Sequence, residues 1–519
     1  LEKKCTMPRK ICCLLCLVFL FCVLTSCGGG DAFEISSSWS ACPAYLDAGS
    51  SLECRMAAMP LNHDDAEGAW INVLVMRARG AGEIKKGQIW FLMGGPGESI
   101  ASYAYPLEVW AQTHPEWDYY ALEHRGAGAS SPLTCPASTD GSAECAADLL
   151  LKWGRSGLAM FNPTQTAHDA AAWMNRVAGE GRRFLYGFSY GTYLAQRFAY
   201  LYPDMLDGLI LDGVVPAGPK KGLYPIDSYD QNANQLVLDI LQRCDADPIC
   251  GSRMRAYGAD SLALLAGTYA KIDGASLCPD LAPLITRTAL HQKLAELGRD
   301  WRGRMVLPAM IYRINRCGAD DAAIIKALFT EQAEPEEDET YPAFSFNLNT
   351  HIITSELIGG LSLAQAQAFS DTAYASPDET LSQYTARDVI GWPVYPPDAA
   401  THQWPATDIP MLLLNGDMDP QTPDHFARFA KSHYPGDRQY LVQFPTANHG
   451  TLLWTLLQDI DIMNVDTCAG RILFDFVNDP ETPPDTTCTA LMIRPDFSGA
   501  SDQARDAASK YFFTTSVWD

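Results

Sequence analysis

The feature that most constrains the fold is a pentapeptide of the form G-x-S-x-G at residues 187–191. An apolar run at residues 183–188 leads directly into Ser189, and a helical pattern follows from Tyr190 to Tyr202. Glycines flank such a serine because the strand turns into the helix so sharply that side chains would clash there. The turn exposes the hydroxyl, and the positive end of the helix points toward it. We therefore predict that Ser189 is a nucleophile at the end of a strand.

Other apolar runs along the chain have the length of buried strands. They cover residues 70–79, 88–93, 118–123, 206–212, 411–414 and 439–444. Continuous apolar runs separated by helical stretches are typical of a mostly parallel sheet with helices on both faces. Binding sites in such sheets form at the carboxyl ends of the strands, and the Gly-rich turns of this chain fall there. We therefore expect an α/β fold with its site at one edge of the sheet.

The middle of the chain has a different pattern. Residues 217–407 are richer in helical patterns and separate the two strand-rich parts. This predicts a helical lid domain inserted into a core that is split between residues 41–216 and 408–519. The acidic run at residues 331–339 is expected to be a solvated loop.

Ser189 needs a base to take its proton and a carboxylate to orient that base. When the serine lies on a strand-to-helix turn, the acid and the histidine follow it along the chain in that order. Asp417 and Asp419 both follow the run at residues 411–414, and the usual spacing favours Asp419, with Asp417 serving the turn. His449 follows the last apolar run in a tight polar turn. We predict a triad of Ser189, Asp419 and His449.

A serine nucleophile also needs two backbone N–H groups that hold the negative oxygen of the tetrahedral intermediate. The residue after the nucleophile, Tyr190, supplies one of them. The second is expected from the glycine-rich loop at residues 94–97, where the backbone can approach a substrate closely. Within that loop we favour Gly95 over Gly94.

The first residues of the chain have the pattern of an export signal. Basic residues precede an apolar run at residues 11–24, which is too short to span a bilayer comfortably. The run ends in Leu24-Thr25-Ser26-Cys27, and this box resembles the signal of bacterial lipoproteins. The resemblance implies a signal peptide at residues 1–26, lipid on Cys27 and a tether at residues 27–40. A plain signal peptide cut nearby, or a short uncleaved anchor, is the alternative.

Ten cysteines follow Cys27, an even number that is expected for disulfides in an exported protein. Pairing near neighbours along the chain gives 42–54, 135–145, 244–250, 278–317 and 468–488. They contain no CxxC or CxxC-H pattern, so we expect these cysteines to hold neither a metal nor haem. The chain carries 38 Lys and Arg against 62 Asp and Glu, a net charge of -24. This balance argues against nucleic acid as a partner.

Taken together, these motifs resemble the prolyl and tripeptidyl aminopeptidase family of serine α/β-hydrolases. The segments that carry the resemblance are residues 94–97, 123–130, 187–192, 416–423 and 448–450, with a C-terminal stretch at residues 468–488. The resemblance implies an α/β-hydrolase fold and an enzyme that removes short pieces from a free peptide N-terminus through an acyl-enzyme, without a cofactor.

The chain departs from that family at several positions. Met93 stands where proline-specific members usually have His, and Glu123 stands where Asp is usual. Thr354 and Gly391 replace two lid cysteines that many relatives carry, which fits the loss of one disulfide. Glu356 is retained beside Thr354 and is predicted to bind the substrate's amino group from the lid, because a carboxylate would favour an ammonium. A surface glutamate is the alternative.

The predicted function is therefore an exported serine aminopeptidase that acts on short peptides with a free N-terminus and contacts a membrane only through a lipid anchor. One alternative is a carboxylesterase that uses the same three side chains. A second is a binding protein on the cell surface that has kept the fold without the activity. An intact Ser, Asp and His in the required order argues against the second.

Overall fold

A nine-stranded sheet organises the part of the protein that the computed structural model describes, residues 38–46, 51–65, 67–136, 139–177, 179, 181–330, 343–458 and 466–519. The strand order across the sheet is β1-β2-β3-β5-β4-β6-β7-β8-β9. The strands are β1 (Ser40–Ala41), β2 (Leu52–Pro60), β3 (Trp70–Arg79), β4 (Gly87–Leu92), β5 (Trp117–Leu122), β6 (Arg182–Phe188), β7 (Gly208–Asp212), β8 (Met411–Gly416) and β9 (Gln439–Phe444).

The pairing confirms a mostly parallel sheet. Strands β5, β4, β6, β7, β8 and β9 pair in parallel, and β1, β2 and β3 form an antiparallel extension that joins β5. The predicted strands at residues 70–79 and 439–444 match β3 and β9 in full. Strand β2 was not expected, because Glu53 and Arg55 interrupt the apolar run that a buried strand usually shows. Its buried side chains alternate instead, as in an antiparallel strand with one covered face.

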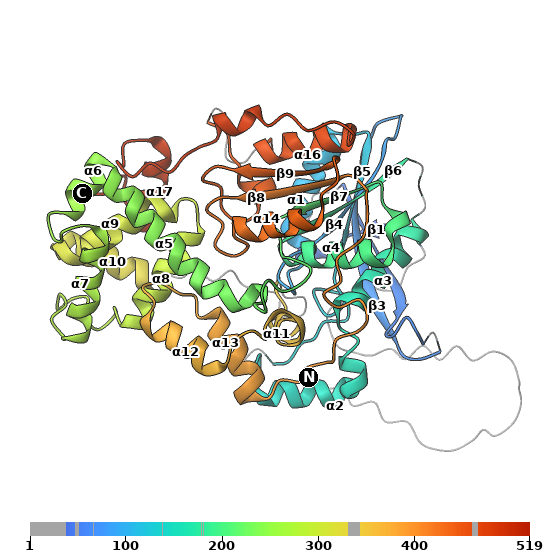
Figure 1. Cartoon of the computed structure of the whole chain (residues 1–519), viewed down its shortest axis with the longest axis horizontal. Coiled ribbons are helices and arrows are strands. Elements are labelled where there is room, and N and C mark those ends of the chain that lie inside the picture. Colours follow the sequence, from blue (N-terminus) through green and yellow to red (C-terminus); the bar gives the residue numbers. More distant parts are fainter. Residues whose placement is uncertain are drawn as a thin grey trace, which may run out of the picture. The chain divides into compact units, whose positions relative to one another are not determined.

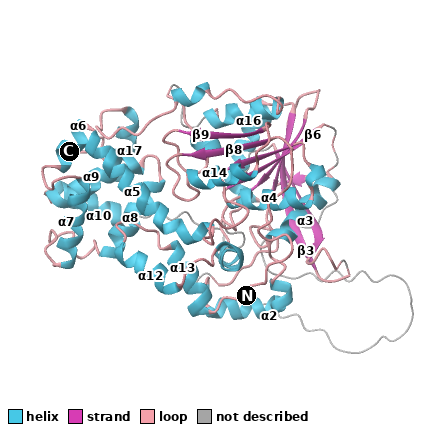
Figure 2. Ribbon diagram, in the orientation of Figure 1, coloured by secondary structure: helices cyan, strands magenta, loops and turns pink. Residues whose placement is uncertain are grey.

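Helices cover both faces of the sheet (Figure 2). On one face α3 packs against α4, and Tyr434 at the end of α14 donates a hydrogen bond to Gln196 of α4 at 2.8 Å. On the other face Trp110 of α1 contacts Phe474 of α16. These helices and their neighbours are α1 (Ala104–Thr113), α2 (Ala143–Leu158), α3 (Pro163–Arg176), α4 (Tyr190–Leu201), α14 (Asp424–His433), α15 (Thr451–Trp454) and α16 (Cys468–Asn478).

Between β7 and β8 every named element of the described residues is helical. The helices are α5 (Tyr229–Ala246), α6 (Pro248–Met254), α7 (Ser261–Asp273), α8 (Arg287–Arg299), α9 (Gly303–Arg316), α10 (Ala319–Thr330), α11 (Phe346–Ile352), α12 (Leu363–Thr372) and α13 (Glu379–Thr385). Short 3-10 or π turns in this segment are η5 (Pro225–Ser228), η6 (Ile353–Leu357) and η7 (Ala386–Ile390). Those outside it are η1 (Ala44–Leu46), η2 (Ile100–Tyr103), η4 (Pro203–Met205) and η8 (Thr487–Leu491). Helices α5–α10 lie to the left of the sheet in Figure 1 and have their own apolar core, whereas the buried apolar residues of α11, α12 and α13 belong to the core of the sheet.

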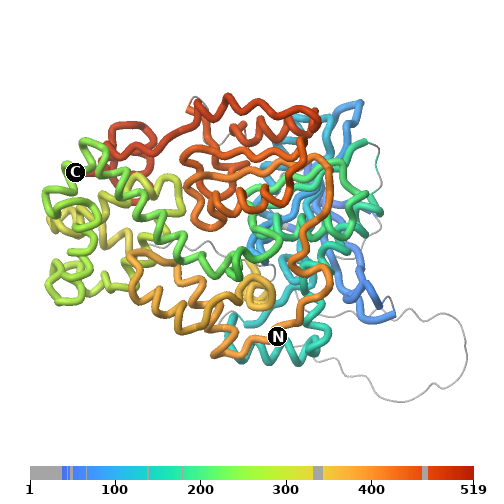
Figure 3. The backbone as a smooth tube through the Cα atoms, viewed as in Figure 1, coloured from blue at the N-terminus to red at the C-terminus, as the bar shows by residue number. Residues whose placement is uncertain are grey.

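The C-terminal residues do not all belong with the sheet. Helix α17 (Asp502–Phe512) packs against α9 and α10, and Figure 3 shows the chain crossing from the sheet to the helices near its end. Ala504, Ala508, Phe512 and Trp518 are buried in the apolar core of the helical segment. The expected assignment of residues 408–519 to the sheet-containing core is therefore wrong for α17, because its apolar face is covered by helices.

All five disulfides form as predicted, 42–54, 135–145, 244–250, 278–317 and 468–488. The predicted signal peptide, Cys27 and most of the tether lie outside the described residues, as does the acidic run at residues 331–339. Among the helices that are described, none is both long and apolar enough to cross a membrane.

Candidate active site

Ser189 occupies the sharp turn that connects β6 to α4. Its backbone lies at φ 54° and ψ −122°, a conformation that non-glycine residues rarely adopt and that needs support from the surrounding structure. The helix crosses the sheet so closely that a Cβ on Gly191 would lie 2.2 Å from the carbonyl oxygen of Leu92. A Cβ on Gly187 would lie 2.3 Å from the carbonyl oxygen of Gly191. The two glycines are therefore required by this close crossing.

Asp419 and His449 meet at the carboxyl ends of β8 and β9. The imidazole Nδ1 of His449 lies 2.7 Å from Oδ2 of Asp419. The other carboxylate oxygen, Oδ1, accepts the backbone N–H groups of Gln421 at 2.8 Å and Thr422 at 3.0 Å. These donors satisfy the buried carboxylate and fix its orientation toward the ring. Asp417 has a different role, because its Oδ1 accepts the N–H of Thr446 at 2.5 Å.

Thr422 is a site residue that the sequence analysis missed. Its hydroxyl donates to Oδ2 of Asp419 at 2.6 Å, and its oxygen lies 3.0 Å from Nδ1 of His449. It therefore braces the contact between acid and base. Its position three residues after Asp419, in the same turn, is the sequence signal that could have identified it.

The charge on the His449 ring is set by opposing effects. Burial disfavours the imidazolium and lowers the pKa, but the charge of Asp419 and its hydrogen bond outweigh burial. The carboxyl groups of Asp212 and Glu98 act in the same direction as Asp419. The net effect raises the pKa of His449, so the ring is a stronger base than an ordinary histidine.

A cavity of about 1160 Å³ opens at this edge of the sheet. Ser189, Tyr190, His449 and Gly95 all line it, and Asp419 lies behind His449. Tyr190 is the first residue of α4, where backbone N–H groups have no acceptor within the helix. The structure thus brings together four of the predicted residues in one cavity, with the fifth in contact with His449.

The loop that carries Gly95 is held by the helical segment. The N–H of Ser345 donates to the carbonyl oxygen of Gly97 at 2.9 Å, and the side chain of Asn349 donates to that of Pro96 at 3.1 Å. Glu123 lies beneath the loop and accepts from the hydroxyl of Ser99 at 3.1 Å. These contacts fix the loop from two sides.

Charged side chains in the cavity wall add a polarity that the sequence analysis did not predict. Glu98 and Glu379 are both half-buried, and burial raises the pKa of each carboxyl group. A Cβ on Gly94 would lie 2.8 Å from Oε2 of Glu98 and 3.1 Å from Cβ of Ser189, so the Glu98 carboxyl group is beside the predicted nucleophile. Arg299 also lines the cavity. Glu98 directly follows the glycine-rich loop, which was the available signal.

Glu356 does not line the cavity, contrary to the expectation that it binds a substrate's amino group. It lies in η6 with its side chain 1% exposed, and Oε2 pairs with the guanidinium of Arg197 at 2.8 Å. Its carboxylate also accepts the hydroxyl groups of Tyr193 at 2.5 Å and Tyr395 at 3.0 Å. The group is fully occupied by these partners, which couple η6 to α4 behind the nucleophile.

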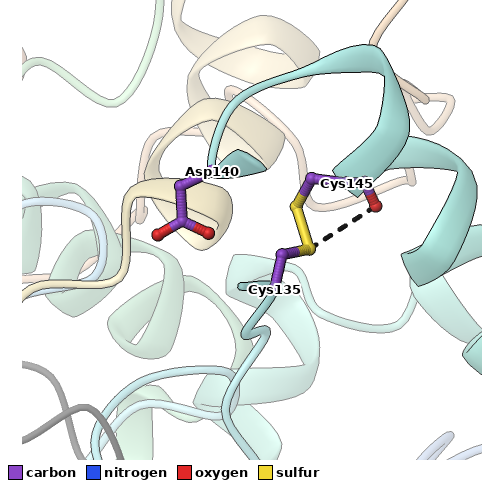
Figure 4. A group of neighbouring side chains, drawn as sticks. All are labelled: Cys135, Asp140 and Cys145. Carbon is purple, nitrogen blue, oxygen red and sulfur yellow. Dashed lines mark hydrogen bonds between the residues drawn. A yellow bond between two sulfur atoms is a disulfide. The ribbon is translucent and has the colours of Figure 1, made fainter. Parts of the chain in front are cut away.

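Cys135 and Asp140 also line the cavity. Figure 4 shows the disulfide between Cys135 and Cys145, with Asp140 nearby. Cys135, Asp140 and Cys145 are the one group of potential metal ligands close together within the described residues. The two sulfurs are bonded to each other, so neither is available as a thiolate. The group is a structural crosslink of the wall.

Two family models match parts of this chain. Residues 89–244 match the family model described as alpha/beta hydrolase fold, and residues 378–488 match the model described as TAP-like protein. Ser189 lies in the first matched region, and Asp419 and His449 lie in the second.

Two curated relatives match part of the chain. A tripeptidyl aminopeptidase of Streptomyces lividans is 26% identical over 204 residues, which cover 34% of this chain and 38% of the relative. The serine protease Hip1 of Mycobacterium tuberculosis is 25% identical over 211 residues, which cover 36% and 40% of the two chains. The matched region thus spans less than half the length of these relatives.

Among solved structures, a carboxyl esterase from Bacillus coagulans is similar at 11% identity over 77% of this chain and 92% of that one, with a TM-score of 0.29. This TM-score is too low to establish the fold, which follows from the strand order and the two family models.

Proposed function

We propose, from the premise that this chain belongs to the serine α/β-hydrolases of the prolyl and tripeptidyl aminopeptidase type, that it cleaves peptide bonds near the free N-terminus of short peptides. The observation that carries the proposal is the contact between His449 and Asp419 beside a cavity that Ser189 also lines. A nucleophile, a base and an orienting acid are the groups that acyl transfer requires.

The proposed reaction proceeds through an acyl-enzyme. His449 takes the proton of the Ser189 hydroxyl as the oxygen attacks the scissile carbonyl carbon. The backbone N–H groups of Gly95 and Tyr190 hold the resulting oxyanion, and Asp419 stabilises the imidazolium. His449 then gives the proton to the leaving amine. Water, activated by the same imidazole, releases the acyl group and regenerates the serine.

The carboxyl groups of the cavity wall support a preference for a free amino terminus. Glu98 and Glu379 are half-buried in the wall, and an ammonium group bound there would stabilise their charged forms. A blocked, neutral N-terminus would leave a charged carboxylate without a partner. The cavity is larger than the 300–1000 Å³ of ordinary small-molecule pockets, which supports a peptide of more than one residue as the ligand.

Matched peptide amides test this proposal. We expect turnover of peptide amides with a free N-terminus and at least about 10-fold lower kcat/KM for the same peptides after N-acetylation, equal to about 1.4 kcal/mol. Glu379→Gln is expected to reduce that ratio by raising KM for the free peptides alone. Glu98→Gln should also reduce it, and should in addition lower the pKa of His449, on which the Glu98 charge acts. Equal rates for free and acetylated peptides would contradict the proposed recognition.

Simple esters separate the peptidase from the carboxylesterase alternative. The proposed function predicts amide turnover, and ester turnover without any amide turnover would favour an esterase. Failure to cleave either class by a folded protein would favour a binding protein.

We further propose that the protein acts outside the cytoplasm, held by lipid on Cys27. Five disulfides support an oxidising compartment. Growth with radiolabelled palmitate is expected to label the unmutated protein but not Cys27→Ala after bacterial expression. Equal labelling of both proteins, or of neither, would exclude lipid on Cys27.

A further inference from the structure

The position of Arg304 is unfavourable for a positively charged side chain. It lies in the first turn of α9, where the helix dipole places partial positive charge and disfavours a cation. Its side chain is also fully buried, at 0% exposure. Burying a charge costs free energy unless the group is paired or hydrogen-bonded. The reason for an arginine here must therefore lie in what its guanidinium contacts.

The guanidinium donates to three backbone carbonyl groups. Nε donates to the carbonyl oxygen of Gly298 at 2.8 Å, within the helical segment. Nη2 donates to that of Met418 at 2.6 Å, and Nη1 donates to that of Thr446 at 3.2 Å. Met418 directly precedes Asp419, and Thr446 lies in the turn that leads to His449. One planar group thus contacts both the turn that carries Asp419 and the turn that leads to His449.

The two turns also contact each other directly. The N–H of Met418 donates to the carbonyl oxygen of Ala447 at 3.0 Å, and the N–H of Thr446 donates to Asp417. Thr446 is held at φ 62°, a left-handed conformation that a β-branched residue adopts only under constraint. The turn that leads to His449 is therefore strained at Thr446, and the hydrogen bond from Arg304 helps to keep it in this conformation.

The guanidinium keeps its charge at neutral pH. Burial lowers its pKa to about 10, while Asp419, Asp300 and Asp417 favour the charged form and Arg243 opposes it. Its positive charge therefore acts on the same Asp419 that orients His449. The other charged groups that act on the ring, Asp212 and Glu98, come from other elements.

We propose that Arg304 is a positioning residue, which ties the Asp419 turn to the His449 turn and so keeps the carboxylate and the imidazole at hydrogen-bonding distance. This inference rests on the proposed triad. The fork geometry of the guanidinium carries the effect, because only a planar group with several fixed N–H donors reaches both turns and Gly298 together.

Two substitutions separate geometry from charge. Arg304→Lys keeps a positive charge but lacks the fork, and Arg304→Gln removes both. Arg313→Gln is the matched control, since Arg313 lies in the same helix, is equally buried and donates to carbonyl groups at the C-terminus instead. All three variants are expected to lose stability, so a thermal unfolding curve accompanies each.

The first readout is kinetic. We expect both Arg304 variants to lower kcat by roughly 10- to 100-fold with KM within about 2-fold, because misplaced catalytic groups slow the chemical step while the cavity wall is unchanged. The acidic limb of kcat/KM should also move to lower pH, because a weakened contact with Asp419 lowers the pKa of His449. Arg313→Gln is expected to keep both kcat and the pH profile.

The second readout does not depend on turnover. The proton between Nδ1 of His449 and Asp419 should give a low-field NMR resonance that is absent in His449→Ala. We expect both Arg304 variants to weaken or shift it, and Arg313→Gln to retain it. Absence of the resonance and of turnover in the unmutated protein would contradict the triad itself. A present resonance that survives Arg304→Gln, or full recovery of kcat by Arg304→Lys, would overturn the positioning role alone.

Discussion

At the scale of single residues, the site depends on how each buried polar group is satisfied. Asp419 is held by two backbone N–H groups and the Thr422 hydroxyl, which leave Oδ2 directed at His449. Glu356 was predicted to bind substrate, but Arg197 and two tyrosines occupy it. Sequence spacing singled out the aspartate that contacts His449, whereas no spacing rule says which carboxylate a buried arginine will bind.

The pair Asp417 and Asp419 gives a matched test of the acid. Asp419→Asn should lower kcat by about 10⁴-fold, because an amide no longer stabilises the imidazolium or fixes its tautomer. It should also move the acidic limb of kcat/KM to lower pH, since Asp419 is what raises the pKa of His449.

Asp417→Asn is the control for this experiment. The amide keeps an oxygen that can accept the N–H of Thr446, so the loss in kcat should stay below about 10-fold. A larger loss of kcat in Asp417→Asn than in Asp419→Asn would show that Asp417, and not Asp419, is the acid. The measurement is the full pH profile of each variant.

Glu123, beneath the glycine-rich loop at residues 94–97, predicts a pH dependence of stability. Burial raises the pKa of its carboxyl group from 4.5 to about 7 in the folded protein. Between these values the unfolded chain releases a proton that the folded protein retains, so stability falls as pH rises through this window. The difference corresponds to about 3 kcal/mol.

Glu123→Gln should remove this dependence, because an amide does not titrate. We expect thermal unfolding midpoints of the variant to change less between pH 4.5 and pH 7 than those of the unmutated protein. Glu144→Gln, an exposed change on α2, should keep the original dependence. Parallel curves for all three proteins would contradict the assignment of the titration to Glu123.

At the scale of secondary-structure elements, the crossing of α4 over the sheet fixes the nucleophile. The strands that support it could be predicted, since their apolar runs are continuous and buried on both faces. Strand β2 could not, because a strand with one covered face leaves only an alternating pattern. The packing of α17 on α9 could not be predicted either, because the pattern of an amphipathic helix does not indicate which apolar core it covers.

Two glycine substitutions test the importance of that crossing. Gly191→Ala places a Cβ 2.2 Å from a backbone oxygen of β4, which cannot move without disturbing the sheet. We expect a loss of about 3 kcal/mol or more in unfolding free energy, together with loss of activity.

Gly267→Ala is the control, because Gly267 lies inside α7 with open space around its Cβ position. It should stabilise the protein by about 0.5–1 kcal/mol, the usual gain from alanine in a helix interior. Chemical denaturation measures both changes. Equal effects of the two substitutions would show that the crossing does not constrain position 191.

At the scale of the whole molecule, two apolar cores and five disulfides hold the chain together. Near-neighbour pairing predicted every disulfide, since each one closes a loop of 39 residues or fewer. The cavity composition could not be predicted, because Glu98, Glu379 and Arg299 are far apart in the sequence and line one cavity only when the helical segment packs against the sheet.

The disulfides in the helical segment are predicted to stabilise it according to loop length. Removing the pair 278–317, with a separation of 39 residues, should cost roughly 4 kcal/mol, and removing 244–250, with a separation of 6, roughly 2 kcal/mol. Neither pair lines the cavity, so kcat at temperatures where the variants are folded should be unchanged. Denaturation of the double-alanine variants measures the difference, and a reversed order would contradict it.

The proposed function depends on activation of Ser189 by His449. Labelling with a fluorophosphonate, followed by peptide mapping by mass spectrometry, tests this most directly. We expect one covalent adduct, on Ser189, and at least about 10³-fold slower labelling in a folded His449→Ala variant. An adduct on another residue, or equally fast labelling of both proteins, would contradict it.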